Sequence, residues 1–347
     1  MNERDSSLDF IKGVCVLLII LGHCPIFRTL YELLYFFHVP IFFVISGYNY
    51  SKRDFISEFI ISCRRLLVPF AFLGFLLLLV AFFSGRFAGK NIFFENLLGV
   101  IWGGGFSYTF NFLPFDKAMS VGPLWFLWAM FWARLLTNCI LRLKNDLLMV
   151  CFVCMAAIVF VNVKQYFSLP FSLIPGICAT GFFCSGYLIK KYKVLEQDRW
   201  NALLLLSLMA FILCLIPDGN LDVNMSVYKG FYILDLLGVI GVFYGFVLVS
   251  RKIIPNNKIA SLLVWIGRYS LIVFCVHALE YNFTNYYAPF LWTKHSFAYS
   301  ICFLIGIRFA IALLGTVIIL KISFLRRYVF NVNSRIGNIK HPTISRN

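Results

Sequence analysis

The 347-residue chain is 61% hydrophobic and 18% aromatic, and only 13% of its residues are charged. Soluble domains carry about 25% charged residues, so this composition excludes an ordinary soluble fold and indicates a protein that folds in lipid. The formal charge of +16 does not indicate nucleic-acid binding, because the basic residues lie in short runs between apolar stretches. The eleven cysteines are scattered without a CxxC pair or a Cys/His cluster, so we expect no metal site.

Apolar stretches of membrane-spanning length follow one another along the chain, and we count about ten of them. They cover residues 8–24, 30–50, 66–84, 122–141, 146–163, 170–189, 201–217, 231–249, 260–281 and 297–322. A further apolar stretch, 92–106, contains Glu95 and three consecutive glycines, which favours an interfacial or re-entrant segment. The sequence therefore predicts an all-α polytopic membrane protein with one domain over residues 1–347 and no cleavable signal peptide.

The distribution of basic residues between these stretches predicts their orientation. When the N-terminus is placed in the cytoplasm, most of the 31 Lys and Arg residues fall in loops on the inner side. Cytoplasmic loops of membrane proteins carry an excess of Lys and Arg. We therefore expect both termini to be cytoplasmic.

Several ionisable residues lie inside the predicted spans, where burial in lipid is costly and a functional role is the default expectation. The basic ones are Lys12, Arg134, Arg268, Arg308 and Lys321. Lys12 is about one turn from the inner boundary, so its side chain can also reach the headgroups by snorkelling. The three arginines, with Arg268 in the middle of a predicted helix, are expected to pair with backbone carbonyls or with internal carboxylates such as Asp235 and Glu280.

Three histidines, His23, His38 and His277, fall in the outer half of the predicted bilayer. Imidazole can take and return a proton near neutral pH, although an interior histidine often only makes a hydrogen bond. Lys12 and His23 are separated by roughly 16 Å along a helix and lie on nearly the same face. That spacing suits a long substrate with an anionic head and a reactive tip, such as a thioester of coenzyme A.

Five motifs resemble, in order, those of the acyltransferase-3 family of membrane O-acyltransferases, in its branch of sugar O-acetyltransferases similar to fucose 4-O-acetylase. The first is a basic residue, ten further residues and a histidine, here with Lys12 in place of the usual arginine. The others are FFHVPIFFVISGYNYSKR (36–53), RRLLVPF (64–70), GPLWFLWAMF (122–131) and IGRYSLIVFCVH (266–277). In another branch of the family a glutamate stands where this chain has Met130.

The resemblance implies a bacterial enzyme of the inner membrane that takes an acyl group, usually acetyl, from cytoplasmic acyl-CoA. The acceptor would be a sugar hydroxyl of a cell-surface glycan or of its lipid-linked precursor. By motif position His23 would be the general base or the acyl relay, and Lys12, Arg64 and Arg65 would hold the phosphates of CoA.

Further candidates complete the expected site. His277 or Tyr48 would donate a hydrogen bond to the developing oxyanion, and Tyr48 is also placed among the donor-binding residues. Asp116 would orient a sugar or a histidine, while His38 and Trp125 would contact the acceptor. The tryptophans equally fit an aromatic belt at the membrane interface.

Two other classes of function compete with an acyltransferase. A transporter of a sugar, a polyol or an acylated lipid would also have many helices with buried Arg and His. Such a transporter often contains an internal repeat, and residues 8–163 and 170–322 show no convincing one. A scaffold or a pH sensor would leave the spacing from Lys12 to His23 unexplained. The oligomeric state, the acceptor sugar and the acyl chain length stay open, and a homodimer is compatible with the sequence.

Overall fold

The computed structural model describes residues 5–88, 92–109, 117–163, 169–196, 201–215, 232–254, 257–292 and 297–332. Most of these residues are helical, as predicted. The helices are α1 (Ser6–Gly22), α2 (Arg28–Phe37), α3 (Pro40–Tyr48), α4 (Phe55–Ser62), α5 (Val68–Ala88), α6 (Ile92–Trp102), α7 (Trp125–Ile140), α8 (Asp146–Val163), α9 (Leu173–Lys191), α10 (Asn201–Leu215), α11 (Tyr232–Ile253), α12 (Lys258–Arg268), α13 (Ser270–Trp292) and α14 (Phe297–Lys321). Short turns of other helix types are η1 (Cys63–Leu67), η2 (Gly122–Leu124), η3 (Leu141–Leu143) and η6 (Leu325–Val329).

One small element departs from an all-α chain. Strands β1 (Tyr108–Thr109) and β2 (Lys117–Ala118) pair antiparallel, with Tyr108 opposite Ala118. The pair lies between α6 and α7, in the stretch that the sequence assigns to the outer side.

Within the described residues, six helices are long and apolar enough to cross a membrane, or seven if a bent pair is counted as one span. The six cover Arg28–Tyr48, Phe55–Phe83, Gly122–Leu143, Leu173–Lys191, Tyr232–Ile253 and Ser300–Lys321. The predicted stretches 146–163 and 201–217 correspond to the shorter apolar parts of α8 and α10. The multi-pass membrane architecture is confirmed, and the count of ten spans stays a prediction.

Two predicted spans are interrupted. The stretch 30–50 contains α2 and α3, and Pro40 is the first residue of α3, where a missing backbone N–H is tolerated. The stretch 260–281 bends by 75° between α12 and α13. Arg268 is therefore the last residue of α12 and does not lie in the middle of a helix, which corrects the sequence-based expectation.

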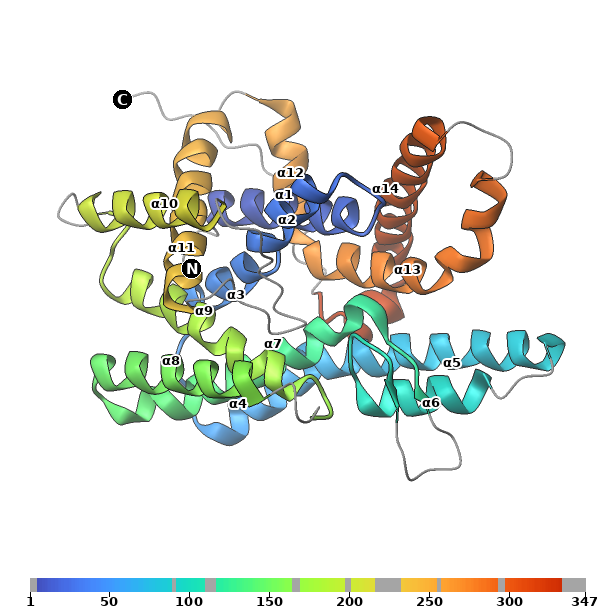
Figure 1. Cartoon of the computed structure of the whole chain (residues 1–347), viewed down its shortest axis with the longest axis horizontal. Coiled ribbons are helices and arrows are strands. Elements are labelled where there is room, and N and C mark those ends of the chain that lie inside the picture. Colours follow the sequence, from blue (N-terminus) through green and yellow to red (C-terminus); the bar gives the residue numbers. More distant parts are fainter. Residues whose placement is uncertain are drawn as a thin grey trace.

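The span predicted over residues 66–84 starts earlier in the structure, at Phe55. Asp54 caps α4 by accepting a hydrogen bond of 2.7 Å from the backbone N–H of Ser57, and this bond lowers the pKa of the Asp54 carboxyl. The helix then continues through η1 into α5, and α6 packs back beside α5 (Figure 1). The apolar stretch 92–106 is thus a short helix that folds against a longer one.

Loops that were assigned to the inner side meet in the structure. The Lys52 ammonium donates to the backbone oxygen of Leu141 at 3.3 Å, and Lys191 pairs with Asp146 at 2.6 Å. The end of α3, the end of α7 and the end of α9 therefore lie on one side of the molecule. Which side faces the cytoplasm stays a prediction.

Helix α1 occupies the centre of the fold. It contacts α2, α3, α11, α12, α13 and α14, and Ile11, Cys15 and Ile20 are fully buried (Figure 1). Its crossing with α12 is close, because a Cβ atom on Gly13 or Gly267 would collide with the backbone of the other helix. This packing fixes the two ends of α1 relative to the rest of the protein.

Candidate functional site

Two cavities open toward opposite ends of α1. The first, here called the basic pocket, has a volume of about 230 Å³ and is lined by Lys12, Arg53, Arg65 and Arg134 together with Ser46, Asn49 and Tyr50. The second, here called the histidine cavity, has a volume of about 940 Å³ and is lined by residues that include His23, Tyr31, Tyr35, Asn96, Tyr281 and Arg308. The predicted pair of Lys12 and His23 thus faces two different cavities.

His23 is the C-cap residue of α1 and is held in one orientation. Its ring Nδ1 lies 2.8 Å from the backbone oxygen of Ile19. A carbonyl oxygen only accepts, so Nδ1 carries the proton and Nε2 has a free lone pair. The backbone oxygen of His23 in turn accepts a hydrogen bond of 2.5 Å from the Arg308 guanidinium. The residue can therefore present a basic nitrogen from a fixed position.

His277, on α13, lies next to His23, with 5.2 Å between the ring centroids. Its Nδ1 is 3.1 Å from a carboxylate oxygen of Glu280, and Arg308 Nε lies 3.4 Å from the other oxygen. Among the residues that the structure describes, Nε2 of His277 has no hydrogen-bond partner. A carboxylate thus orients a second imidazole beside the first.

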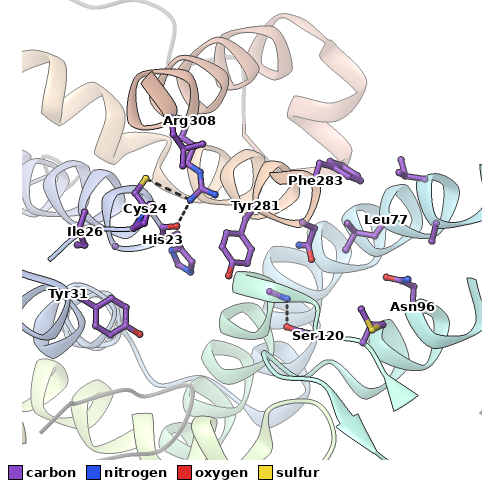
Figure 2. A pocket seen from close by; sticks show the side chains of 18 of the residues that line it. His23, Cys24, Ile26, Tyr31, Leu77, Asn96, Ser120, Tyr281, Phe283 and Arg308 are labelled. Carbon is purple, nitrogen blue, oxygen red and sulfur yellow. Dashed lines mark hydrogen bonds between the residues drawn. The ribbon is translucent and has the colours of Figure 1, made fainter. Parts of the chain in front are cut away.

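Aromatic rings close around the two histidines. The Tyr281 ring is 4.8 Å from that of His23, and the Arg308 guanidinium lies over Tyr281 at 5.6 Å. Figure 2 shows His23, Tyr281 and Arg308 together on one side of the cavity, with Asn96 and Ser120 toward the other. Asn96 lies on α6, and Ser120 lies in the segment after β2. These two segments therefore form one wall of the site.

His38 lies behind this group and is completely buried. Its Nδ1 bonds the backbone oxygen of Leu34, and its ring packs edge-on against Tyr35 at 4.8 Å. Tyr35 lines the cavity and is 6.3 Å from the ring of His23. The structure therefore brings two predicted histidines together and connects the third through a tyrosine.

The structure also locates the remaining predicted acceptor residues. Asp116 lies outside the described residues. Trp125 is buried at the start of α7 against Phe126, with 6.2 Å between ring centroids, and does not line the histidine cavity. Trp125 was expected at the acceptor because of its motif, but here its ring fills the protein interior.

In the basic pocket the positive charges are held by buried carboxylates. Lys12 pairs with Asp9 at 2.7 Å, so its ammonium has a partner inside the protein in addition to any contact with headgroups. Glu58 pairs with both Arg53, at 3.1 Å, and Arg134, at 2.7 Å. The predicted pairing of deep arginines with internal carboxylates is confirmed for Arg134, and also for Arg308, whose partner is Glu280.

Two predicted donor-binding residues lie outside this pocket. Arg64 is exposed and Tyr48 lies under the ammonium of Lys190 at 5.6 Å; neither lines the basic pocket. Arg65, the neighbour of Arg64, does line it. Because consecutive helical residues point in directions about 100° apart, only one of the pair can face the cavity.

Sequence reasoning missed several residues of both cavities. Arg53 and Arg134 join the basic pocket, and Tyr281, Asn96 and Ser120 line the histidine cavity. For Arg134 a signal was present, since a charge deep in a span indicates a functional site. Asn96 and Ser120 gave none, because they come from a segment whose return over the cavity depends on tertiary packing. Among the described residues, no group of three His, Cys, Asp or Glu side chains is placed to hold a metal ion.

A family model described as an acyltransferase domain matches residues 5–325. The chain belongs to the acyltransferase-3 family. The resemblance seen in the five sequence motifs is thereby confirmed, and the residues that line the two cavities lie within the matched part of the chain.

Two curated relatives of this acyltransferase are nodulation proteins. Nodulation protein NolL of Sinorhizobium fredii is 30% identical over 243 residues, which make up 63% of this chain and 59% of that protein. NolL of Mesorhizobium japonicum is 24% identical over 244 residues, 63% of this chain and 58% of that protein. The similarity thus spans less than two thirds of each relative. No solved structure gives a significant match to the acyltransferase described here.

Proposed function

We propose that this acyltransferase transfers an acyl group, most simply acetyl, from acyl-CoA to a sugar hydroxyl. The acceptor is part of a cell-surface glycan or of its lipid-linked precursor, and the enzyme lies in a bacterial inner membrane with the basic pocket facing the cytoplasm. One observation carries the proposal: α1 runs between a pocket lined by four basic side chains and a cavity lined by His23, whose ring lies 5.2 Å from that of the buried His277. Lys12 and His23 are roughly 16 Å apart along the helix, a distance that the pantetheine arm of CoA can cover.

In this proposal the basic nitrogen of His23 takes the proton from the acceptor hydroxyl. The hydroxyl oxygen then attacks the thioester carbon, a C–O bond forms, the C–S bond breaks, and the proton passes to the sulfur of CoA. General base catalysis of this kind contributes about 10²–10⁴ in rate. The adjacent His277, whose Nε2 has no hydrogen-bond partner among the described residues, lies beside His23 and is placed to share the proton.

Arg308 is the best-placed group to stabilise the oxyanion. It lines the histidine cavity, and its planar guanidinium already donates to the backbone oxygen of His23, which places the rigid fork of N–H donors beside the base. His277 suits that role less well, because its Nδ1 proton is engaged by Glu280. We therefore assign His277 to proton transfer and Arg308 to charge stabilisation.

The lining of the histidine cavity includes groups that suit a sugar. Tyr31 and Tyr35, which stack on each other with 4.0 Å between ring centroids, supply aromatic surface near His23. Asn96 and Ser120 supply an amide and a hydroxyl from the other side. Carbohydrate sites commonly combine apolar ring faces with a few polar groups that fix orientation. His38 contributes by fixing Tyr35, which it contacts directly.

The proposal is tested with purified protein and radiolabelled acetyl-CoA, by comparing His23→Ala with wild type. We expect hydrolysis and transfer to fall by about 10² or more, since the base is lost. Thr29→Ala, an exposed change on α2 at the same end of α1, serves as the matched control and should behave as wild type.

Three outcomes of the assay separate the alternatives. Activity that survives His23→Ala unchanged removes His23 from the chemistry. Radiolabel that stays on acid-quenched protein indicates an acyl relay in place of direct transfer. Uptake of a sugar or polyol into vesicles without acyl-CoA, together with no acyl transfer, replaces the proposal with a transporter.

A further inference from the structure

The basic pocket holds more positive charge than its carboxylates neutralise. Four cationic side chains line it, and the carboxylates paired with them are Asp9 and Glu58. Among the described residues, Arg65 has no carboxylate within ion-pair distance. A concave site with such an excess of cations attracts an anionic ligand.

Glu58 organises two of these cations although it does not line the pocket. Its side chain is fully buried, and its two oxygens bind Arg53 from the loop before α4 and Arg134 from α7. The Ser62 hydroxyl donates to Glu58 at 2.9 Å and accepts from Arg134 at 3.1 Å. The carboxylate therefore fixes two guanidinium groups from distant parts of the chain.

A second polar link ties the same two segments together. The Asn138 side chain on α7 donates to the Tyr50 hydroxyl at 2.6 Å and to the backbone oxygen of Arg53 at 3.1 Å. The Arg134 guanidinium also lies over the Tyr50 ring at 5.4 Å. The arginines are thus held in place before any ligand binds, which reduces the entropy lost on binding.

We propose that Arg53 and Arg134 bind the phosphate groups at the nucleotide end of the acyl-CoA donor, and that Glu58 is their positioning residue. The inference rests on the proposed function for the identity of the donor. Planar guanidinium groups bind phosphate through paired hydrogen bonds, which a lysine cannot reproduce. Arg53 and Arg134, which Glu58 holds side by side at the pocket, are therefore suited to paired contacts with phosphate oxygens.

The test compares two donors that share the same thioester. Acetyl-CoA carries the phosphates, whereas S-acetylpantetheine carries the arm and the acetyl group without any phosphate. We expect Arg53→Ala and Arg134→Ala to lower kcat/KM for acetyl-CoA about tenfold or more, through KM, and to leave kcat/KM for S-acetylpantetheine unchanged. A merely structural role would lower both values equally and would overturn the inference.

Control variants accompany this comparison of the two donors. Lys52→Ala removes an exposed cation next to Arg53 that does not line the pocket, and it should leave both donors unaffected. Glu58→Gln should raise KM for acetyl-CoA alone, and Glu58→Asp should restore part of the loss. If Glu58→Gln does not fold, Arg53→Ala still decides the matter, because the Arg53 side chain is 37% exposed and its removal leaves the core intact.

Direct binding separates this inference from the function on which it rests. Wild type in an uncharged detergent should bind adenosine 3′,5′-bisphosphate by calorimetry, and Arg134→Ala should bind it at least about tenfold more weakly. Displacement by phosphatidylglycerol, with no preference for the nucleotide, would assign the pocket to lipid headgroups and overturn the inference. Acyl transfer without nucleotide binding also overturns it, whereas nucleotide binding without any acyl transfer overturns only the proposed function.

Discussion

The basic pocket and the histidine cavity hold their reactive side chains by different means. In the smaller pocket, of about 230 Å³, buried carboxylates fix cations that stay charged. At the larger cavity, of about 940 Å³, His23 is fixed by a backbone carbonyl, and the neighbouring buried His277 is fixed by Glu280 and has an Nε2 without a hydrogen-bond partner among the described residues. One end of α1 is therefore suited to permanent charge and the other to proton transfer.

This difference suggests how one buried apolar helix, α1, carries two polar sites at an acceptable cost. Lys12, Arg134 and Arg308 each have a carboxylate partner inside the protein, on the same helix for Lys12 and on another helix for the two arginines, because an unpaired charge in a low-dielectric interior is expensive. Glu58 and Glu280 play corresponding parts at the two ends, since each carboxylate holds an arginine from another helix. Variants at the two ends should accordingly separate donor binding from chemistry.

The largest effect is expected where both ends are disturbed at once, at the crossing of α1 and α12. Gly13→Ala places a Cβ against the backbone of Leu263, which cannot move without shifting α12. We expect a loss of about 1–3 kcal/mol in the free energy of unfolding, visible as a lower Tm in detergent. Gly245→Ala, where the new Cβ meets nothing within 4 Å, is the control. An unchanged Tm for Gly13→Ala would show that the two helices do not cross closely.

Next in size is a change confined to the histidine cavity. Glu280→Gln removes the charge that orients His277 and pairs with Arg308, so kcat should fall about 10²-fold. KM for acetyl-CoA should change by less than about twofold, because the basic pocket is intact. Glu32→Gln, which breaks only the surface ion pair with Arg28 on α2, should be silent. A rise in KM with unchanged kcat would place Glu280 at the donor site instead.

A smaller effect is expected at the opposite end. Lys12→Ala should raise KM for acetyl-CoA about tenfold while kcat stays nearly constant, because a charge-assisted contact to phosphate is lost. Lys12→Arg, which restores the residue usual in the first motif, should return KM to the wild-type value or below it. Lys258→Ala, on the exposed start of α12, is the matched control. A fall in kcat at constant KM would reject the phosphate-binding role of Lys12.

The smallest effect concerns the wall that faces His23. Asn96→Ala removes an amide from the α6 side of the cavity, and one neutral hydrogen bond contributes about 0.5–1.5 kcal/mol. We expect KM for the acceptor sugar to rise a few-fold while KM for acetyl-CoA is unchanged. Asn162→Ala, at an exposed position on α8, controls for loss of an asparagine. Equal changes in both KM values would argue against an acceptor role for this wall.

Much of the site was predictable because its residues lie in local patterns. Lys12 lies on α1 and His23 is its C-cap, so the helical repeat predicts a separation of roughly 16 Å along the axis. Only the structure shows that the two side chains face different cavities. Charge inside an apolar stretch marked Arg134 and Arg308 as residues in need of partners. Their partners were only partly foreseen: Glu280 was a candidate, whereas Glu58 lies in the middle of the predicted loop 51–65.

The sequence by itself determined the membrane environment and the family, and it placed His23 at the end of the first apolar stretch. Composition, apolar run length and short motifs are local properties, so they can be read without the tertiary structure. Only the tertiary structure decided which groups meet. Arg53 and Arg134 are joined by Glu58 although many residues separate them, and His277 reaches His23 because α13 turns away from α12 by 75°. The far wall of the histidine cavity also depends on tertiary packing, because α6 contributes to it by folding back beside α5. Such contacts depend on the packing of whole helices, and local residue patterns do not encode how distant helices pack.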